Sequence, residues 1–151
     1  MKLLLDENVP APMTSTVKLL LRRSHDVRHV NDMTGWSGTK DLHLYGRAVD
    51  AGFHVVVTND AMQMNRKLEV EAIARSGLHR IQYPQRQNGL AGLGLAMATV
   101  CAALRPVLQE LAAADGQRLV NLRAVDPGRD RRYGVRDPIT DPPKFWPRQA
   151  T

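Results

Sequence analysis

Three aspartates occupy positions where alternating strands and helices would bring them together. Asp6 follows the apolar run at residues 3–5, Asp60 follows the apolar run at residues 55–57, and Asp41 begins the helix expected between them. Ligand sites in open parallel sheets lie outside the carboxyl ends of the strands, so these acids are site candidates by position as well as charge. Acids after a strand can also start the next helix as its N-cap and first turn, and that alternative stays open.

Three carboxylates from separate loops at one sheet edge would repel one another and raise each other's pKa unless a cation lay among them. Hard oxygen ligands, few in number and leaving room for water, suit Mg²⁺ or Mn²⁺. Such an ion can activate water and stabilise the charge that builds on a phosphodiester during in-line displacement. The spacing of Asp6, Asp41 and Asp60 therefore favours metal-assisted phosphodiester chemistry.

Polar neighbours of these acids have two interpretations each. Asn8 and Asn59 could orient the acids or bind metal through their amide oxygens, but asparagine after a strand is more often part of a turn. Thr58 could hold Asp6 by a hydrogen bond or could be an ordinary residue at a strand end. We keep all three as supporting residues, with Asp32 as a reserve ligand.

Two further side chains invite a chemical interpretation. Trp36 lies between two glycines and could stack on a base, anchor a partner helix or fold over the core. Cys101 is the single cysteine and falls within an apolar helical stretch, so we expect a buried, inert thiol and no internal disulfide.

The elements that must position the acids alternate along the chain. Apolar runs and turn residues predict a β-α-β-α-β-α-β-α-β order, typical of α/β proteins. We therefore expect a three-layer α/β/α fold with a mostly parallel sheet. Strands are predicted near residues 1–5, 25–30, 53–58, 79–83 and 118–122, and the last two helices over 62–75 and 95–114, with a loop at 84–94.

The length of 151 residues and a 43% hydrophobic composition predict one domain, over residues 1–125. Residues 126–151 are rich in Pro and Arg and are predicted to form an extended or mobile C-terminal tail. The first apolar run meets an acid at once, so we expect a soluble, cytoplasmic protein without a membrane partner. The long apolar helix over 95–114 could pack within the core or bury a face in a homodimer.

The net charge of +6 is unevenly placed. Basic and acidic residues balance in residues 1–60, so residues 61–151 carry the whole excess. A basic surface attracts phosphate backbones and releases their counterions, which suits a protein that binds nucleic acid. The alternative is a basic surface that only keeps the protein in solution.

Four motifs follow one another in the first part of the chain: LLLDENVP at 3–10, SHDV at 24–27, DLHL at 41–44 and VVVTND at 55–60. Through them the first 75 residues or so resemble the compact PIN-like toxins of prokaryotic toxin–antitoxin systems. This resemblance implies a PIN-like fold, a metal-dependent single-strand ribonuclease of the VapC kind using Mg²⁺ or Mn²⁺, and a cognate antitoxin protein. It also implies that Asp6 is the central metal ligand, with Asp41 and Asp60 as further catalytic acids and Glu7 close by.

The chain departs from the family pattern at one position. Relatives commonly carry another acid two residues after the one matching Asp60, where this chain has Met62. A weakened PIN-like protein that binds nucleic acid or an antitoxin without cleavage is therefore the alternative function. A phospho-receiver domain would also gather acids after parallel strands, but it needs a lysine on a late loop, and residues 68–143 contain none.

Overall fold

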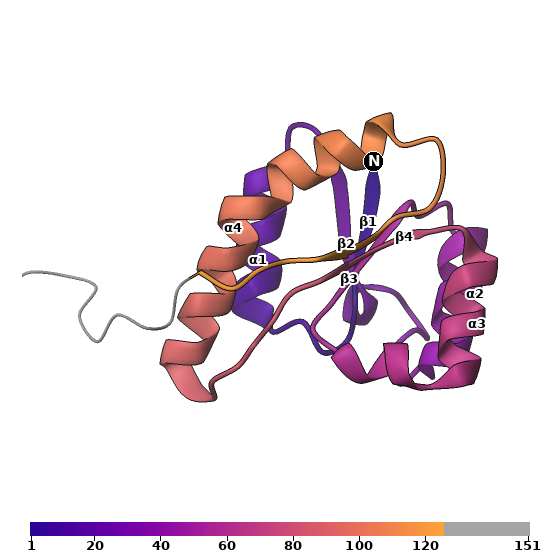
Figure 1. Cartoon of the computed structure of the whole chain (residues 1–151), viewed down its shortest axis with the longest axis horizontal. Helices are drawn as coiled ribbons and strands as arrows, with labels where there is room; N and C mark the ends of the chain where they lie inside the picture. The colour runs from indigo at the N-terminus through magenta and orange to yellow at the C-terminus, as the bar shows by residue number, and fades with distance from the viewer. Residues whose placement is uncertain (126–151) are drawn as a thin grey trace, which may run out of the picture.

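Five short strands form one sheet in the computed structural model, which describes residues 1–125 (Figure 1). The order across the sheet is β2-β1-β3-β4-β5, and every neighbouring pair is parallel. Leu3 of β1 pairs with Val27 of β2 on one side and with Val55 of β3 on the other. The strands are β1 (Lys2–Leu5), β2 (Asp26–His29), β3 (Val55–Thr58), β4 (His79–Gln82) and β5 (Leu119–Asn121).

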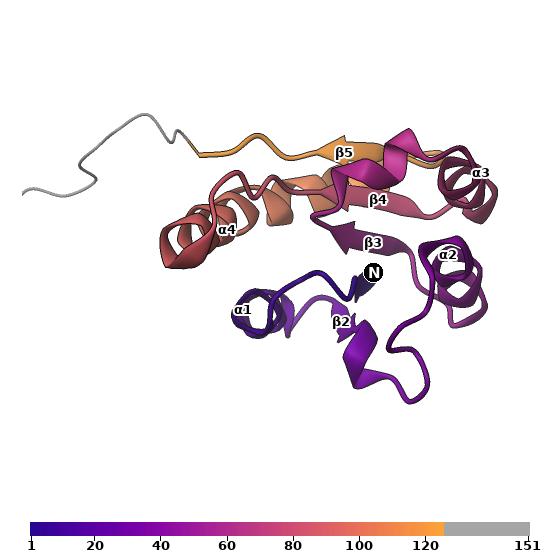
Figure 2. The ribbon, with the colours of Figure 1, turned by 90° about the horizontal axis from the view of Figure 1, so that it is seen from below.

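Helices cover both faces of this sheet, as Figure 2 shows. Helices α1 (Ala11–Leu21) and α4 (Gly89–Ala113) lie on one face. Helices α2 (Asp41–Asp50) and α3 (Lys67–Ser76) lie on the other. The predicted three-layer α/β/α architecture is therefore confirmed.

The two covered faces explain why β1 and β3 are apolar without alternation. Leu3 and Leu5 point into the core beneath α1 and α4, whereas Leu4 points into the core beneath α2 and α3. Val56 of β3 likewise packs with the second core. Because both faces of a central parallel strand are buried, each of its residues is selected to be apolar. The first polar residues after these strands then emerge at the carboxyl edge of the sheet.

The helix predicted over residues 62–75 is wrong over residues 62–66. The chain forms a short 3₁₀ turn, η2 (Ala61–Asn65), and only then α3. Asp60 caps η2 by accepting a hydrogen bond from the Met62 backbone N–H, and Arg66 is extended, with φ −111° and ψ 112°. Asx capping and an extended residue interrupt a continuous helix. The break places Arg66 at the start of α3, beside the acids.

The loop predicted over 84–94 is shorter than expected, because α4 already begins at Gly89. Within the described residues α4 is the one helix long and apolar enough, by length and composition, to cross a membrane. Its buried residues, including Val100 and Leu104, pack into the first core. Cys101 lies on the other side of the helix and is exposed, so the prediction of a buried thiol is wrong.

Trp36 belongs to the second core. A second 3₁₀ turn, η1 (Val30–Asp32), leads into its loop. The indole is nearly buried and packs edge to face against Phe53, with 6.1 Å between the ring centroids. The Arg47 guanidinium carbon lies over the indole, 4.5 Å from the ring centroid. Of the three interpretations of Trp36, the one that folds it over the core fits these contacts.

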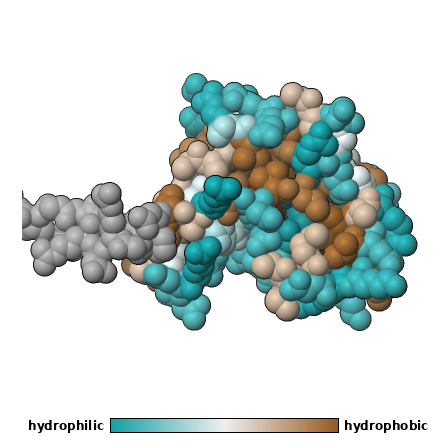
Figure 3. Space-filling model, in the orientation of Figure 1, coloured by the Kyte–Doolittle hydropathy of each residue, from teal (hydrophilic) through white to brown (hydrophobic). Residues whose placement is uncertain are grey.

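Strand β5 forms one edge of the sheet and faces the viewer in Figure 3, where apolar residues gather near the middle of the surface. Leu119 on this strand is 52% exposed.

The predicted tail at 126–151 lies outside the described residues, so the domain boundary at residue 125 stays a prediction.

Candidate active site

Asp6 is a buried carboxylate at the end of β1. It is 2% exposed, and its Oδ2 accepts a hydrogen bond of 2.8 Å from the Thr58 hydroxyl. Its Oδ1 accepts the backbone N–H of Glu7 at 2.6 Å, and the Asn8 amide reaches Oδ2 at 3.5 Å. A buried carboxylate costs a great deal unless such donors replace its water. Asp6 is therefore fixed in orientation at the carboxyl edge of the sheet.

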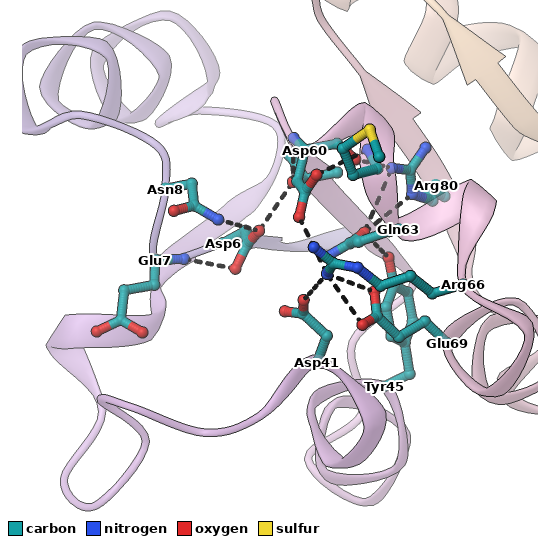
Figure 4. Close-up of polar contacts among 12 residues, drawn as sticks. Asp6, Glu7, Asn8, Asp41, Tyr45, Asp60, Gln63, Arg66, Glu69 and Arg80 are labelled. Atoms are coloured by element: carbon teal, nitrogen blue, oxygen red, sulfur yellow. Dashed lines mark hydrogen bonds and ion pairs between the residues drawn. The ribbon is translucent and has the colours of Figure 1, made fainter.

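Thr58 connects Asp6 to Asp60. Its hydroxyl donates to Asp6 and accepts the Asp60 backbone N–H at 3.0 Å. Asp60 uses Oδ1 to cap η2, which leaves its Oδ2 directed to the same side as Asp41 (Figure 4). The ends of two paired strands and one shared hydroxyl thus set the separation of the first and third predicted acids.

Asp41 arrives from the opposite side, in the first turn of α2. Burial raises the pKa of this carboxyl above its ordinary value of 3.8, and the charges of Asp6, Glu69 and Asp60 raise it further. The side-chain amide of Gln63 acts in the other direction and lowers it. The three predicted aspartates therefore share one electrostatic environment, and Glu69 of α3 shares it with them.

Arg66 lies among these acids. Its Nη1 is 3.0 Å from Glu69 Oε1, 3.8 Å from Asp41 Oδ2 and 3.9 Å from Asp60 Oδ2. Figure 4 shows the guanidinium directed toward all three carboxylates. The two aspartate pairs are long and the arginine side chain is 52% exposed, so they do not offset the burial and repulsion that raise the pKa of Asp41.

A buried polar network supports the acids from beneath. Arg80 of β4 is 1% exposed and donates to the Asp60 backbone carbonyl at 2.6 Å. It also donates to Gln63 Oε1 at 3.3 Å, and the Tyr45 hydroxyl donates to the same oxygen at 3.3 Å. Burial raises the pKa of the Tyr45 hydroxyl. Because these contacts converge on η2, they hold the turn that follows Asp60.

Two groups of this region carry a polar atom without a partner. The Gln63 Nε2 and the Tyr83 hydroxyl are fully buried and have no hydrogen-bond partner among the described residues. Burial raises the pKa of Tyr83, and the charge of Asp6 contributes to that shift. Buried donors without partners are rare in folded proteins, and here both lie near the acids.

The structure does not bring every predicted residue into the cluster. Glu7 is exposed and turns away from Asp6, where it accepts hydrogen bonds from the Ser37 hydroxyl and the Gly38 backbone N–H. Asn8 is exposed and its contact with Asp6 is at the limit of a hydrogen bond, while Asn59 is half-buried. Asp32 pairs with Lys18 at 2.6 Å, and that contact lowers its pKa, so it serves a different part of the surface.

The sequence analysis missed Arg66, Glu69, Gln63 and Arg80. A continuous helix over residues 62–75 would have been read as an ordinary amphipathic segment. Recognising Asp60 as a cap would have revealed the break before Lys67 and turned attention to the next charged pair, Arg66 and Glu69. The role of Arg80 depends on strand order, and its sequence neighbours give no signal of it.

The donor chemistry of the site fits a hard divalent cation. Carboxylates of Asp6, Asp41, Asp60 and Glu69 are the oxygen ligands that Mg²⁺ and Mn²⁺ prefer. Within residues 1–125, however, no three acidic, histidine or cysteine side chains converge as a ready ligand set. The reason is visible in the contacts: Asp6 is held by Thr58 and by the Glu7 backbone N–H, while the other three acids surround Arg66.

Comparison with protein families gives one match. Residues 1–84 match the model of a family described as a PIN like domain. No match is found among curated proteins, and none among solved structures. The matched segment ends just after β4 and contains every acid of the cluster.

Proposed function

Because the chain belongs to the PIN-like domain family, whose members are generally nucleases and usually depend on divalent metals, we propose that it is a metal-dependent ribonuclease acting on single-stranded RNA. In this proposal it is the cytoplasmic toxin of a toxin–antitoxin pair, and a cognate antitoxin protein is its partner. The observation that carries the nuclease activity is the group of carboxylates at the carboxyl edge of β1 and β3, anchored on the buried Asp6.

Asp6, Asp41 and Asp60 would hold the ion, which we expect to be Mg²⁺ or Mn²⁺. When bound, the ion would supply an activated water and stabilise negative charge on the phosphate. Thr58 orients Asp6 through its hydroxyl, and Arg80 holds the backbone that carries Asp60. Both contacts lie beneath the acids, so the open side is left for a substrate.

A hollow beside the acids is lined by three basic side chains, two acids and two leucines. Lys40, Arg66 and Lys67 line a hollow of about 540 Å³ between the beginnings of α2 and α3, together with Asp41 and Glu69. Positive side chains next to an acidic centre can hold phosphates on either side of the one to be cut, without reading the base sequence. This arrangement supports a nucleic acid substrate.

The second candidate function is binding without cleavage. Met62 stands where an acid is expected, is 55% exposed, and accepts a weak contact from the Asn65 amide at 3.6 Å. Its thioether is a poor ligand for a hard cation. A protein that lacks this acid would still bind RNA or an antitoxin through the hollow between α2 and α3.

One assay separates the two functions. The purified protein is incubated with labelled single-stranded RNA and Mn²⁺ or Mg²⁺, beside Asp6→Asn and a control, Asp26→Asn, which changes a half-exposed surface acid. The nuclease proposal expects cleavage that requires the metal, stops with a chelator, is lost in Asp6→Asn and is kept in Asp26→Asn. Binding without cleavage by the wild-type protein would instead establish the second candidate.

A second assay addresses the toxin. Expression of the wild-type chain in a bacterial host is expected to arrest growth, and Asp6→Asn is expected to relieve the arrest at equal protein level. Normal growth with an active, soluble nuclease would remove the toxin part of the proposal and leave the nuclease part intact.

A further inference from the structure

The acidic site contains a cation that the chain itself supplies. The Arg66 guanidinium carries its charge at every accessible pH, and its contacts with acids raise its pKa further, the hydrogen bond to Glu69 contributing most. It lies within ion-pair distance of three carboxylates from two different helices and from η2. In the described structure the acids are therefore balanced by a side chain of the protein.

The contacts of this arginine differ in strength. Glu69 is only 16% exposed, and its two carboxylate oxygens accept hydrogen bonds from Arg66 Nη1 at 3.0 and 3.3 Å. The pairs with Asp41 and Asp60 are longer, at 3.8 and 3.9 Å, and the arginine side chain is half exposed. Long ion pairs at an exposed position are weak and easily exchanged. Arg66 can thus leave the aspartates without disturbing the core.

Glu69 adds a fourth carboxylate to the three predicted aspartates. Met62 is exposed, while the Glu69 side chain is 16% exposed and its charge raises the pKa of Asp41. The glutamate reaches the site because α3 begins at Lys67, after the break at Arg66. The fourth carboxylate near the aspartates thus comes from a residue seven positions after Met62.

A second observation is a buried donor without a partner at the acidic site. The Gln63 Nε2 is fully buried, has no partner among residues 1–125, and faces Asp41 closely enough to lower its pKa. Its other amide atom is already fixed by Tyr45 and Arg80, so the amide cannot turn away. The free donor is satisfied if the Asp41 carboxylate shifts toward it. Besides Arg66, Gln63 is therefore a second group that the Asp41 carboxylate can bond.

We infer that Glu69 is the fourth carboxylate of the proposed metal site and that Arg66 is its resident counter-ion. Arg66 holds Asp41, Asp60 and Glu69 together in the metal-free protein and moves to solvent when a divalent cation binds. The inference rests on the proposed function, since it assigns the same acids to a metal. It explains why the acids are gathered yet no ready ligand set is formed.

Metal binding without RNA tests this assignment. Mn²⁺ is titrated by calorimetry into the full chain, into Arg66→Gln and into Glu69→Gln. Removal of one solvent-screened unit charge beside a divalent ion is expected to change its Kd by roughly tenfold. Arg66→Gln should bind Mn²⁺ roughly tenfold more tightly, and Glu69→Gln roughly tenfold more weakly, by the same screened-charge argument.

The same helix offers matched controls. Arg75→Gln and Glu71→Gln make the same changes of charge in α3 without a contact to the acids, and their Kd should stay within about twofold of the wild-type value because exposed distant charges are screened. Arg66→Lys keeps the charge and loses the planar fork, so its Kd should lie near that of the wild type. A thermal melt before each titration shows whether the variant is folded, and Arg66→Met removes the same charge if Arg66→Gln does not fold.

The outcomes are distinct. An Arg66→Gln Kd that is unchanged or weaker shows that the arginine supports the site and does not compete with the ion, and overturns the inference. Equal Kd values for Glu69→Gln and Glu71→Gln remove Glu69 from the ligand set. RNA cleavage by the wild type alongside either result leaves the proposed function standing, whereas the expected Kd changes without RNA cleavage refute the function and keep the inference.

Discussion

Replacing Thr58 by valine removes one hydroxyl and almost no volume. Thr58 is fully buried, donates to the buried Asp6 carboxylate at 2.8 Å, and accepts the Asp60 backbone N–H at 3.0 Å. Valine suits a strand as well as threonine does, so the backbone has no reason to move. The substitution therefore isolates the hydroxyl that links the first and third acids.

The expected cost follows from the partners. A hydrogen bond to a charged group contributes about 1.5–3 kcal/mol, and a buried N–H without an acceptor costs about 1 kcal/mol or more, so Thr58→Val should lower the free energy of unfolding by about 2–4 kcal/mol. The control is Thr99→Val in α4, which is equally buried and bonds only neutral backbone groups, Leu95 O and Val125 N. It should cost about 1–2 kcal/mol, because it also leaves an N–H without its acceptor but loses no bond to a charged group.

Urea unfolding at neutral pH, followed by circular dichroism, measures both free energies. Thr58→Val should also weaken Mn²⁺ binding, because Asp6 loses one of the donors that orient it, while Thr99→Val should leave that Kd unchanged. An equal cost for the two variants would refute the idea that Thr58 serves a charged carboxylate. The hydroxyl would then be no more than a satisfied polar group of the core.

Other features of the structure give expectations that need only one variant or one reagent. The raised pKa of Asp41 means that its charged form destabilises the metal-free fold above the ordinary pKa of 3.8. Asp41→Asn should therefore raise the urea midpoint at pH 7, and the gain should shrink as the pH falls toward 4; a constant gain would contradict this origin. Gly92→Ala would place its Cβ 1.8 Å from the Gln87 carbonyl oxygen, so it should lower the free energy of unfolding by about 1–3 kcal/mol or prevent folding. Gly94→Ala, which meets nothing within 4 Å, should raise it by about 0.5–1 kcal/mol. Cys101 should react with a thiol reagent in the native protein; a reaction that needs denaturant would show the thiol to be covered.

The fold was predictable where local pattern and burial agree. The leucines of β1 and the valines of β3 do not alternate with polar residues. Such a run is typical of a strand that is buried on both faces. The strand positions alone then predict Asp6 and Asp60 at one edge of the sheet. Asp41 followed because the first turn of the intervening helix opens at the same edge.

The rest of the site depends on contacts that sequence spacing does not encode. Arg66 and Glu69 join the site because the Asp60 side chain caps η2 and the helix begins only after residue 66. The hydrophobic pattern of the sequence does not indicate that break. Arg80 supports Asp60 because β4 lies next to β3, which is a fact of strand order. Glu7 shows the reverse: it adjoins Asp6 in sequence, yet its side chain points to the loop at Ser37.

The central claim is that the acids at the carboxyl edge of β1 and β3 cut RNA with a divalent metal. The rate of single-stranded RNA cleavage at saturating Mn²⁺, compared between the wild type and Asp6→Asn, tests it most directly. We predict cleavage by the wild type that disappears with a chelator and is absent in Asp6→Asn. Cleavage that survives in Asp6→Asn, or a folded wild type that binds Mn²⁺ and RNA without cutting, would contradict the account.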